Sequence, residues 1–155
     1  MSLMFNWQQI KNRHHGLTFD DVLLMPKKSE LRSRRDPSLK SKLTKTKFLE
    51  TPIISANMDT VTEAKMAIAM NNLGGLGIIH RFMNVEQQVA HIREVAESGA
   101  PIISASIGVN ADFKERTAAL VAAGVNVMTI DIAHGHSVQM METLKWLKDT
   151  YAGLE

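Results

Sequence analysis

Three short apolar runs of this sequence are each followed by residues that can do chemistry. Residues 55–60 read Ser-Ala-Asn-Met-Asp-Thr, His80 and Arg81 follow a second run, and Asp131 lies near the end of a third. A carboxylate beside an apolar strand is costly unless partners bind it, and the vicinal hydroxyls of a ribose supply two donors. A flexible thioether such as that of Met58 packs well against a planar base. These residue types suit a ligand that contains a base and a ribose.

Each of these residues also has a structural explanation. Met58 can pack the rim of the fold, and Asp131 can pair with a cation on a neighbouring loop. Asp59 is placed to accept backbone hydrogen bonds at the start of a helix, and we prefer that role for it. His134 and His136 are one residue apart, but zinc sites generally use three or four protein ligands and the sequence offers no further convincing set. We therefore predict no metal site.

Composition is that of a globular chain of 155 residues, with 45% hydrophobic and 22% charged residues. No apolar run approaches the roughly 20 residues needed to span a bilayer, and the first residues do not resemble a secretory signal. Cysteine is absent, which excludes disulfides, thiolate metal sites and a cysteine nucleophile within these residues. We expect a cytoplasmic protein without a membrane partner.

Basic residues are concentrated in one segment. Residues 27–47 contain nine Lys or Arg against Glu30 and Asp36, whereas the whole chain has a net charge of only +2. Such a cluster can bind nucleic acid. Serine, proline and leucine interrupt this one, however, and residues 27–47 contain no aromatic residue for base stacking, the next one along the chain being Phe48. We interpret it as a solvated loop or hairpin and do not expect a nucleic-acid partner.

Four apolar runs are each followed by a helical pattern, at a spacing of about 25 residues. The runs are too short for helices and lie beside glycine, proline or asparagine, so we predict buried parallel strands. They are residues 52–56, 76–79, 101–107 and 125–132.

The helices between these strands have recognisable ends and faces. Asn84 with Gln87 has the spacing of a capping box, and Ser137 is placed to cap the last helix. The predicted inward residues are Met66, Ala69, Met70 and Leu73 in the first helix, Val85, Val89, Ile92 and Val95 or Ala96 in the second, Phe113, Thr117, Leu120 and Val121 in the third, and Met140, Leu144, Leu147 and Tyr151 in the fourth.

Two α/β architectures contain such units. A doubly wound sheet usually has a glycine-rich turn after its first strand, but the turn at residues 55–60 has no glycine. We therefore predict a (β/α)8 TIM barrel, a fold of about 250 residues, of which this chain supplies about the first four βα units. An N-terminal segment with the basic loop or hairpin occupies residues 1–50, the half-barrel occupies residues 51–155, and a C-terminal half is expected to complete it.

Four segments resemble the IMP dehydrogenase and GMP reductase family. They are residues 16–26, 55–64, 74–80 and 131–137, and they occur in the family's order and spacing. The resemblance implies that Ala56 and Met58 bind the purine nucleotide and that Asp131 binds the ribose of the nicotinamide cofactor. It further implies that Ala133, His134 and Gly135 line the cofactor pocket and that Arg81 lies near the nicotinamide.

The resemblance implies one of two reactions at carbon 2 of a purine. IMP dehydrogenase oxidises IMP to XMP with NAD through a cysteine adduct that water hydrolyses, and GMP reductase converts GMP to IMP and ammonia with NADPH. The motifs at residues 59–63 and 85–89 favour the dehydrogenase. The sequence His80-Arg81-Phe82 and the direct link at residues 98–101, where many dehydrogenases carry an inserted CBS domain pair, favour the reductase. We prefer a dehydrogenase that lacks the insert.

By the resemblance, the residues that catalyse the reaction are expected to lie outside this chain. The family's catalytic cysteine loop and its monovalent-cation site, which can hold potassium, lie beyond the fourth helix, so we predict no catalytic residue here and an inactive fragment. The family's tetramers suggest a homo-tetramer. The alternative from another class is a non-catalytic half-barrel that binds a nucleotide or a partner chain.

Overall fold

The computed structural model describes residues 17–110 and 112–155 and divides the chain into two units. The division falls between Pro37 and Ser38, earlier than the boundary at residue 50 expected from the sequence. In the first unit, residues 17–37 form turns without a helix or strand. One turn is closed by Thr18, whose backbone N–H donates to the Asp21 carboxylate at 2.9 Å.

The second unit begins with a two-stranded antiparallel hairpin, β1 (Ser41–Lys42) and β2 (Phe48–Leu49). Leu49 is buried against Leu76, Ile102 and Val127, which belong to the segments of the main sheet. The hairpin therefore covers one face of that sheet and shields its apolar residues from water.

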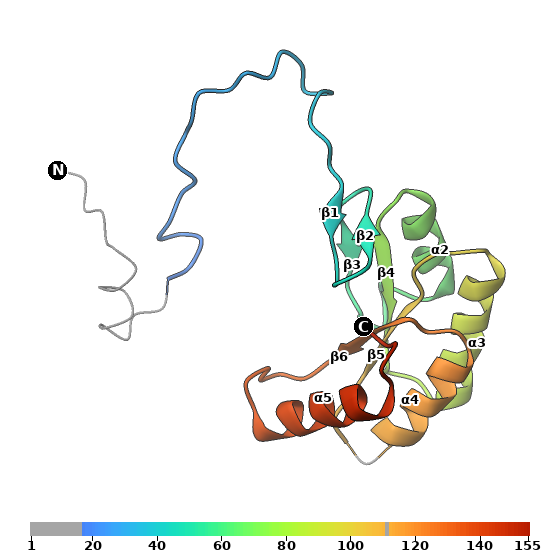
Figure 1. The fold of residues 1–155 in the computed structure, drawn as a ribbon. Helices are drawn as coiled ribbons and strands as arrows, with labels where there is room; N and C mark the ends of the chain where they lie inside the picture. Colours follow the sequence, from blue (N-terminus) through green and yellow to red (C-terminus); the bar gives the residue numbers. More distant parts are fainter. Residues whose placement is uncertain (1–16, 111) are drawn as a thin grey trace. The chain divides into compact units, whose positions relative to one another are not determined.

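The main sheet has four parallel strands in chain order, β3-β4-β5-β6 (Figure 1). The strands are β3 (Ile54–Ser55), β4 (Leu76–Ile79), β5 (Ser104–Ile107) and β6 (Val127–Ile130). Each lies within a segment that the sequence predicts as a strand, so the parallel α/β prediction is confirmed.

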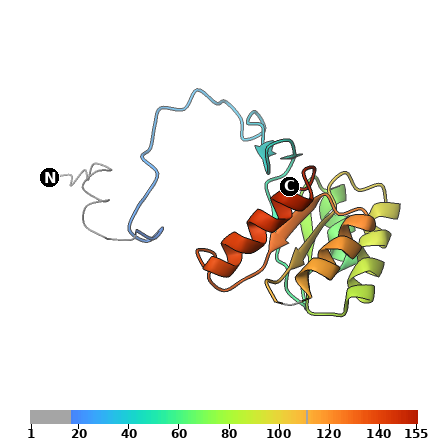
Figure 2. The ribbon, with the colours of Figure 1, turned by 60° about the horizontal axis from the view of Figure 1, so that its bottom comes forward.

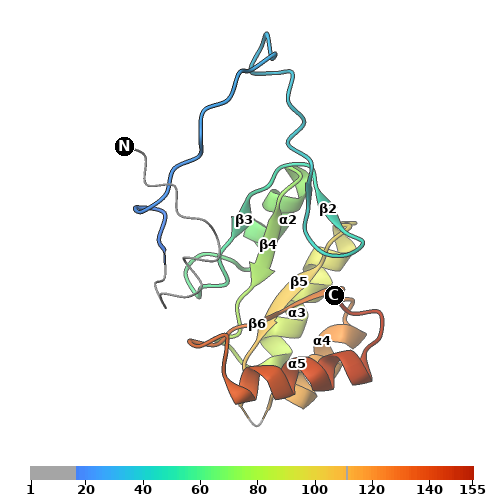
Figure 3. The ribbon, with the colours of Figure 1, turned by 60° about the vertical axis from the view of Figure 1, so that its left-hand side comes forward.

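Four helices connect and follow the strands and lie together on one side of the sheet (Figures 2 and 3). Ala64, Ile92, Leu120 and Leu147, one from each helix, pack with Ile79, Ala105 and Ile107 of the sheet in a single core. The helices are α2 (Ala64–Asn72), α3 (Val85–Glu97), α4 (Phe113–Ala122) and α5 (Val138–Thr150). Within the part of the chain that the structure describes, none of the helices has the length and apolar character to cross a membrane.

The predicted helix caps at Asn84 and Ser137 are confirmed. Asn84 Oδ1 accepts the Gln87 N–H at 2.8 Å, and Gln87 Oε1 accepts the Asn84 N–H at 3.2 Å, which completes a capping box. The Ser137 hydroxyl accepts the Met140 N–H at 3.2 Å at the start of α5. Both caps satisfy backbone donors that the first turn of a helix leaves without a partner.

The predicted inward face of α2 is wrong. Met66 is 41% exposed and Leu73 is 73% exposed, whereas Ala64 and Ala67 are buried. The cause is the close approach of α2 to β4, because a methyl group at Gly77 would lie only 2.4 Å from the Cα of Ala67. Only small side chains fit where α2 contacts β4. A helix face predicted mainly from large apolar residues therefore does not include Ala64 and Ala67.

The outer edge of β6 carries one further pair of backbone bonds. The Met128 N–H donates to the Glu155 carbonyl at 2.7 Å, and the Glu155 N–H donates to the Asn126 carbonyl. These bonds have the pattern of a parallel ladder in which Glu155 lies opposite Val127. The chain thus returns after α5 to the sheet edge in the same direction as the four strands.

Candidate functional site

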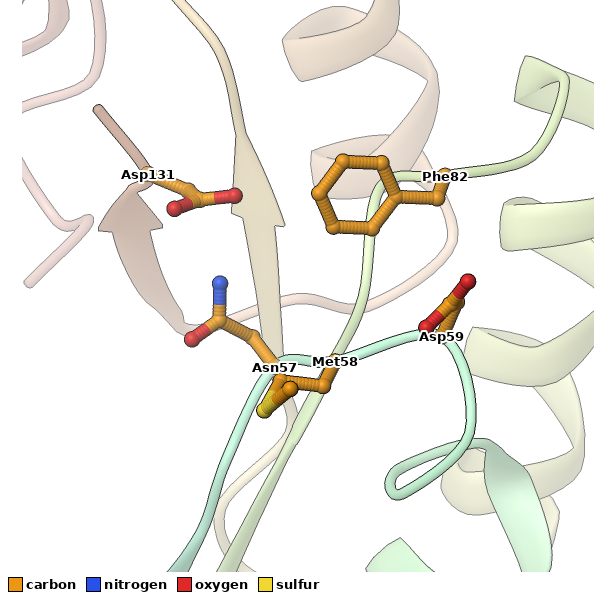
Figure 4. Close-up of a pocket in the computed structure, with 5 residues that line it drawn as sticks. All are labelled: Asn57, Met58, Asp59, Phe82 and Asp131. Atoms are coloured by element: carbon orange, nitrogen blue, oxygen red, sulfur yellow. The ribbon is translucent and has the colours of Figure 1, made fainter. Parts of the chain in front are cut away.

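The candidate site is a pocket of about 320 Å³ beyond the carboxyl ends of the strands. In parallel α/β folds this is the end of the sheet at which ligands bind. Its volume lies at the lower end of the range of small-molecule pockets. Figure 4 shows that the side chains which surround the space come from three separate loops. The lining residues are Asn57, Met58, Asp59, Phe82 and Asp131.

The loop after β3 places Met58 at the pocket. The Met58 carbonyl accepts the N–H groups of Val61 and Thr62, at 3.0 and 3.2 Å, and so closes a tight turn. Thr62 is fully buried, and its hydroxyl donates to the Ala56 carbonyl at 2.6 Å while lying 2.8 Å from the Ser55 hydroxyl. Thr62 therefore bonds to the backbone on both sides of Asn57, at Ala56 and at Met58, and holds the turn that carries the Met58 side chain.

Arg81 is held between three partners at the tip of β4. Its Nε donates to Asp131 Oδ2 at 2.9 Å, and its guanidinium lies 4.8 Å from the centre of the Phe82 ring, a cation–π distance. A methyl group at Gly108 would lie 3.5 Å from Arg81 Nη1, so the guanidinium also rests against that glycine. The cation is therefore fixed rather than free in solvent.

Asp131 continues β6 into the pocket. Its backbone N–H donates to the Ile107 carbonyl at 2.8 Å, which extends the β5–β6 ladder to the strand tip. Among the described residues, only Oδ2 of its carboxylate accepts a hydrogen bond, and Arg81 donates it. The other oxygen has no donor among the described residues. The sequence also allowed a structural role for Asp131, namely a salt bridge to a loop cation. That salt bridge is present, and its cation is Arg81, itself a predicted site residue.

Beneath Arg81 lies a buried histidine to which the sequence assigned no role. His80 is 3% exposed; its Nδ1 accepts the Phe82 N–H at 3.1 Å, and its Nε2 lies 3.4 Å from Glu63 Oε1. Because Nδ1 accepts, the neutral tautomer with a proton on Nε2 satisfies both contacts. His91 approaches the other oxygen of Glu63 at 3.9 Å. His80 thus connects the start of α2 to the backbone of the pocket loop.

The structure brings some predicted site residues together and leaves others apart. Met58 and Asp131 line the pocket, and Arg81 bonds to Asp131. The other four, Ala56, Ala133, His134 and Gly135, are exposed and are not among its lining residues. In residues 17–110 and 112–155, no group of three or more His, Asp or Glu is arranged to hold a metal ion.

The prediction for Asp59 is wrong, and two further pocket residues were missed. α2 begins at Ala64 with Glu63 at its N-cap position, so Asp59 does not cap the helix and instead lines the pocket. Asn57 and Phe82 also line it. Their position directly after predicted strand ends was the available signal, because side chains there converge at one edge of a parallel sheet.

Comparison with known proteins decides the family. A family model described as the IMP dehydrogenase / GMP reductase domain matches residues 16–155. The chain belongs to this family. The resemblance found in the sequence is therefore confirmed.

The relatives of this IMP dehydrogenase / GMP reductase domain are longer than the chain. An inosine-5'-monophosphate dehydrogenase of Cryptosporidium parvum is 38% identical over 180 residues, covering 89% of this chain and 44% of that protein. One of Halalkalibacterium halodurans is 56% identical over 98 residues, covering 63% of this chain and 20% of that protein. A GMP reductase of Leishmania donovani is 44% identical over 88 residues, covering 57% of this chain and 18% of that protein. The chain spans less than half the length of each.

Proposed function

We propose that these residues form part of an IMP dehydrogenase, which oxidises IMP to XMP with NAD and water. The observation that carries this proposal is the pocket in which Met58 and Asp131, distant in the sequence, face a common space. A thioether and an aromatic ring suit a planar base, and a carboxylate suits ribose hydroxyls. Two relatives named inosine-5'-monophosphate dehydrogenase, at 56% and 53% identity, support the choice of reaction.

The proposed architecture is a (β/α)8 barrel to which this chain contributes the first four units. Four parallel strands in chain order with helices on one side are the arrangement of consecutive barrel units. The parallel backbone bonds of Glu155 to β6 support a fifth strand at that edge. A C-terminal half outside these residues would close the barrel, and the greater length of the relatives supports it.

The residues of the pocket fit a nicotinamide cofactor. Asp131 has one carboxylate oxygen without a donor among the described residues, and vicinal hydroxyls can donate to it. Arg81 orients that carboxylate, and the exposed ring of Phe82 offers a flat apolar surface. Ala133, His134 and Gly135, in the loop after β6, are proposed to contact the remainder of the cofactor, and Ala56 the purine nucleotide. When bound, NAD would accept the hydride from carbon 2 of the purine.

The residues described here would bind and orient the reactants without forming the covalent adduct. The chain contains no cysteine, so the thiolate of the proposed mechanism would belong to residues outside these 155, and the family resemblance implies the same for any potassium site. We propose a homo-tetramer in the cytoplasm, on the family resemblance. Residues 98–103 join α3 directly to β5 with no regulatory domain between them, a link that fits a dehydrogenase without the insert and a reductase equally.

GMP reductase is the second candidate, because a GMP reductase of Leishmania donovani is 44% identical over 88 residues. The test is turnover by a longer protein that includes these residues. IMP with NAD should yield NADH, and GMP with NADPH should yield no ammonia. Activity with the second pair alone would replace the dehydrogenase proposal. Binding of IMP or NAD without turnover of either pair would instead support the non-catalytic half-barrel that binds a nucleotide.

A further inference from the structure

The loop at residues 80–83 places Phe82 in the pocket lining and Arg81 against the pocket residue Asp131, and two buried polar side chains hold its ends. Gln88 of α3 binds the carbonyl of His80, and Arg116 of α4 binds the carbonyl of Met83. Neither belongs to the pocket lining, and neither was identified from the sequence. Together they connect two helices of the outer layer to the loop that presents the ion pair.

Gln88 is fully buried and uses every polar atom of its side chain. Its Nε2 donates to the His80 carbonyl at 3.0 Å and to the Ser106 carbonyl at 2.9 Å. Its Oε1 accepts from Arg116 Nη1 at 2.8 Å. One amide therefore joins the end of β4 to β5 and fixes the point at which the pocket loop leaves the sheet.

Arg116 is 8% exposed and completes the connection. Its Nη2 donates to the Met83 carbonyl at 3.1 Å, and its Nε donates to Asp112 Oδ2 at 3.0 Å. The Asp112 carboxylate compensates the charge of a guanidinium that is almost withdrawn from water. The planar guanidinium reaches three partners through a fixed fork of N–H groups, a geometry that the compact ammonium of a lysine does not reproduce.

We propose that Gln88 and Arg116 are positioning residues of the pocket. The nearby core positions Ile92 and Leu120 are apolar, so packing alone does not require an amide and a guanidinium here. Their bonds instead fix the two ends of a short loop whose middle carries Arg81 and Phe82. The role in ligand binding rests on the proposed function, whereas the role in holding the loop does not. A binding group on a loop is effective only when surrounding bonds fix its orientation.

The test is amide hydrogen exchange in the 155-residue chain without ligand. The Phe82 N–H, bonded to His80 Nδ1, reports opening of the loop, and amides of core strands report global unfolding. Gln88→Met keeps the volume but removes the hydrogen bonds to the carbonyls of His80 and Ser106 and the bond from Arg116 Nη1. We expect Phe82 exchange to rise roughly tenfold beyond what the loss of global stability explains.

Leu120→Ala is the matched control, because it creates a cavity one turn after Arg116 on the same buried face of α4. Its Phe82 exchange should follow global stability alone. The same behaviour in Gln88→Met would overturn the proposal. If Gln88→Met does not fold, Arg116→Lys, which keeps the charge but loses the fork, decides by the same measurement.

A second measurement separates this inference from the proposed function. Binding of NAD to the folded variants is followed by calorimetry. Weaker binding by Gln88→Met than by Leu120→Ala supports positioning for the cofactor, and equal binding refutes it. If the unaltered chain binds neither NAD nor IMP, the proposed function fails for these residues, while the exchange data still decide whether Gln88 and Arg116 hold the loop.

Discussion

Arg81 and Asp131 join the tips of β4 and β6 across the intervening strand β5, with 2.9 Å between Nε and Oδ2. Both side chains are 28% exposed, so water screens the pair and its contribution to stability is modest. The main effect of the ion pair is on the orientation of the Asp131 carboxylate. The guanidinium holds the carboxylate in one orientation and leaves its other oxygen without a donor among the described residues.

Replacing Asp131 with alanine should weaken NAD binding by about 10- to 100-fold, because a charged acceptor for ribose hydroxyls is lost. Calorimetry on the chain, or the Michaelis constant for NAD in a longer active protein, measures the effect. Asp149→Ala, at an exposed position of α5, is the control and should bind NAD as the unaltered chain does. Equal affinities of the two variants would remove Asp131 from the site.

Replacing Phe82 with alanine should weaken nucleotide binding by roughly 5- to 100-fold, the effect of losing an aromatic surface for one base. The Phe82 ring is 57% exposed and lines the pocket, so little of its apolar area is used within the folded chain. The control is Phe48→Ala, which removes an exposed ring from the hairpin. Titrations of IMP and NAD, followed by chemical shifts, identify which of the two ligands depends on the ring. Unchanged affinity for both would argue against stacking.

The strand order and most helix ends could be predicted from local patterns. The apolar runs before residues 80 and 131 gave the strands, and Asn84 with Gln87 gave a helix start, because each signal depends on a few neighbouring residues. The inward face of α2 could not be predicted in this way. It depends on how closely Gly77 and Ala67 approach, which only the folded sheet determines.

The candidate site was predictable in part for a similar reason. Met58 and Asp131 were candidates because each lies at the end of a predicted strand, and such ends converge at one edge of a parallel sheet, whereas their binding roles came from the family resemblance. Gln88 was missed, although its spacing from Val85 and Ile92 places it on the buried face of α3. A polar residue on such a face finds partners distant in the sequence, here the carbonyl of Ser106 and the guanidinium of Arg116, and no local pattern contains them.

Gly77→Ala should destabilise the chain by about 1–3 kcal/mol or more, because the new methyl group would overlap the backbone of Ala67 at 2.4 Å. Helix α2 and strand β4 would have to separate to accommodate it. Gly135→Ala is a suitable control, since its methyl group would meet no atom within 4 Å and its φ is not positive. Urea unfolding should give a lower midpoint for the first variant only. Similar midpoints for both would show that the contact between α2 and β4 is not tight.

Glu155 should make stability depend on pH in the acid range. Hydrogen bonds from the Thr44 and Thr46 hydroxyls lower the pKa of its carboxyl from the ordinary 4.5 to about 2. Since the folded pKa lies below the unfolded one, the carboxylate stabilises the fold fully above pH 4.5 and loses this effect as the pH falls toward 2. Glu155→Gln should therefore reduce the fall in stability over that interval.

Urea unfolding of the unaltered chain and of Glu155→Gln, at several pH values between 5 and about 2, measures the difference in how their stability falls with pH. Other carboxyl groups contribute equally to both proteins. Glu142→Gln, at an exposed position of α5, is the control and should retain the slope of the unaltered chain. A slope for Glu155→Gln identical to that of the unaltered chain would mean that the bonds between Glu155 and the hairpin do not persist in solution. The hairpin would then cover its face of the sheet through Leu49 and Leu43 alone.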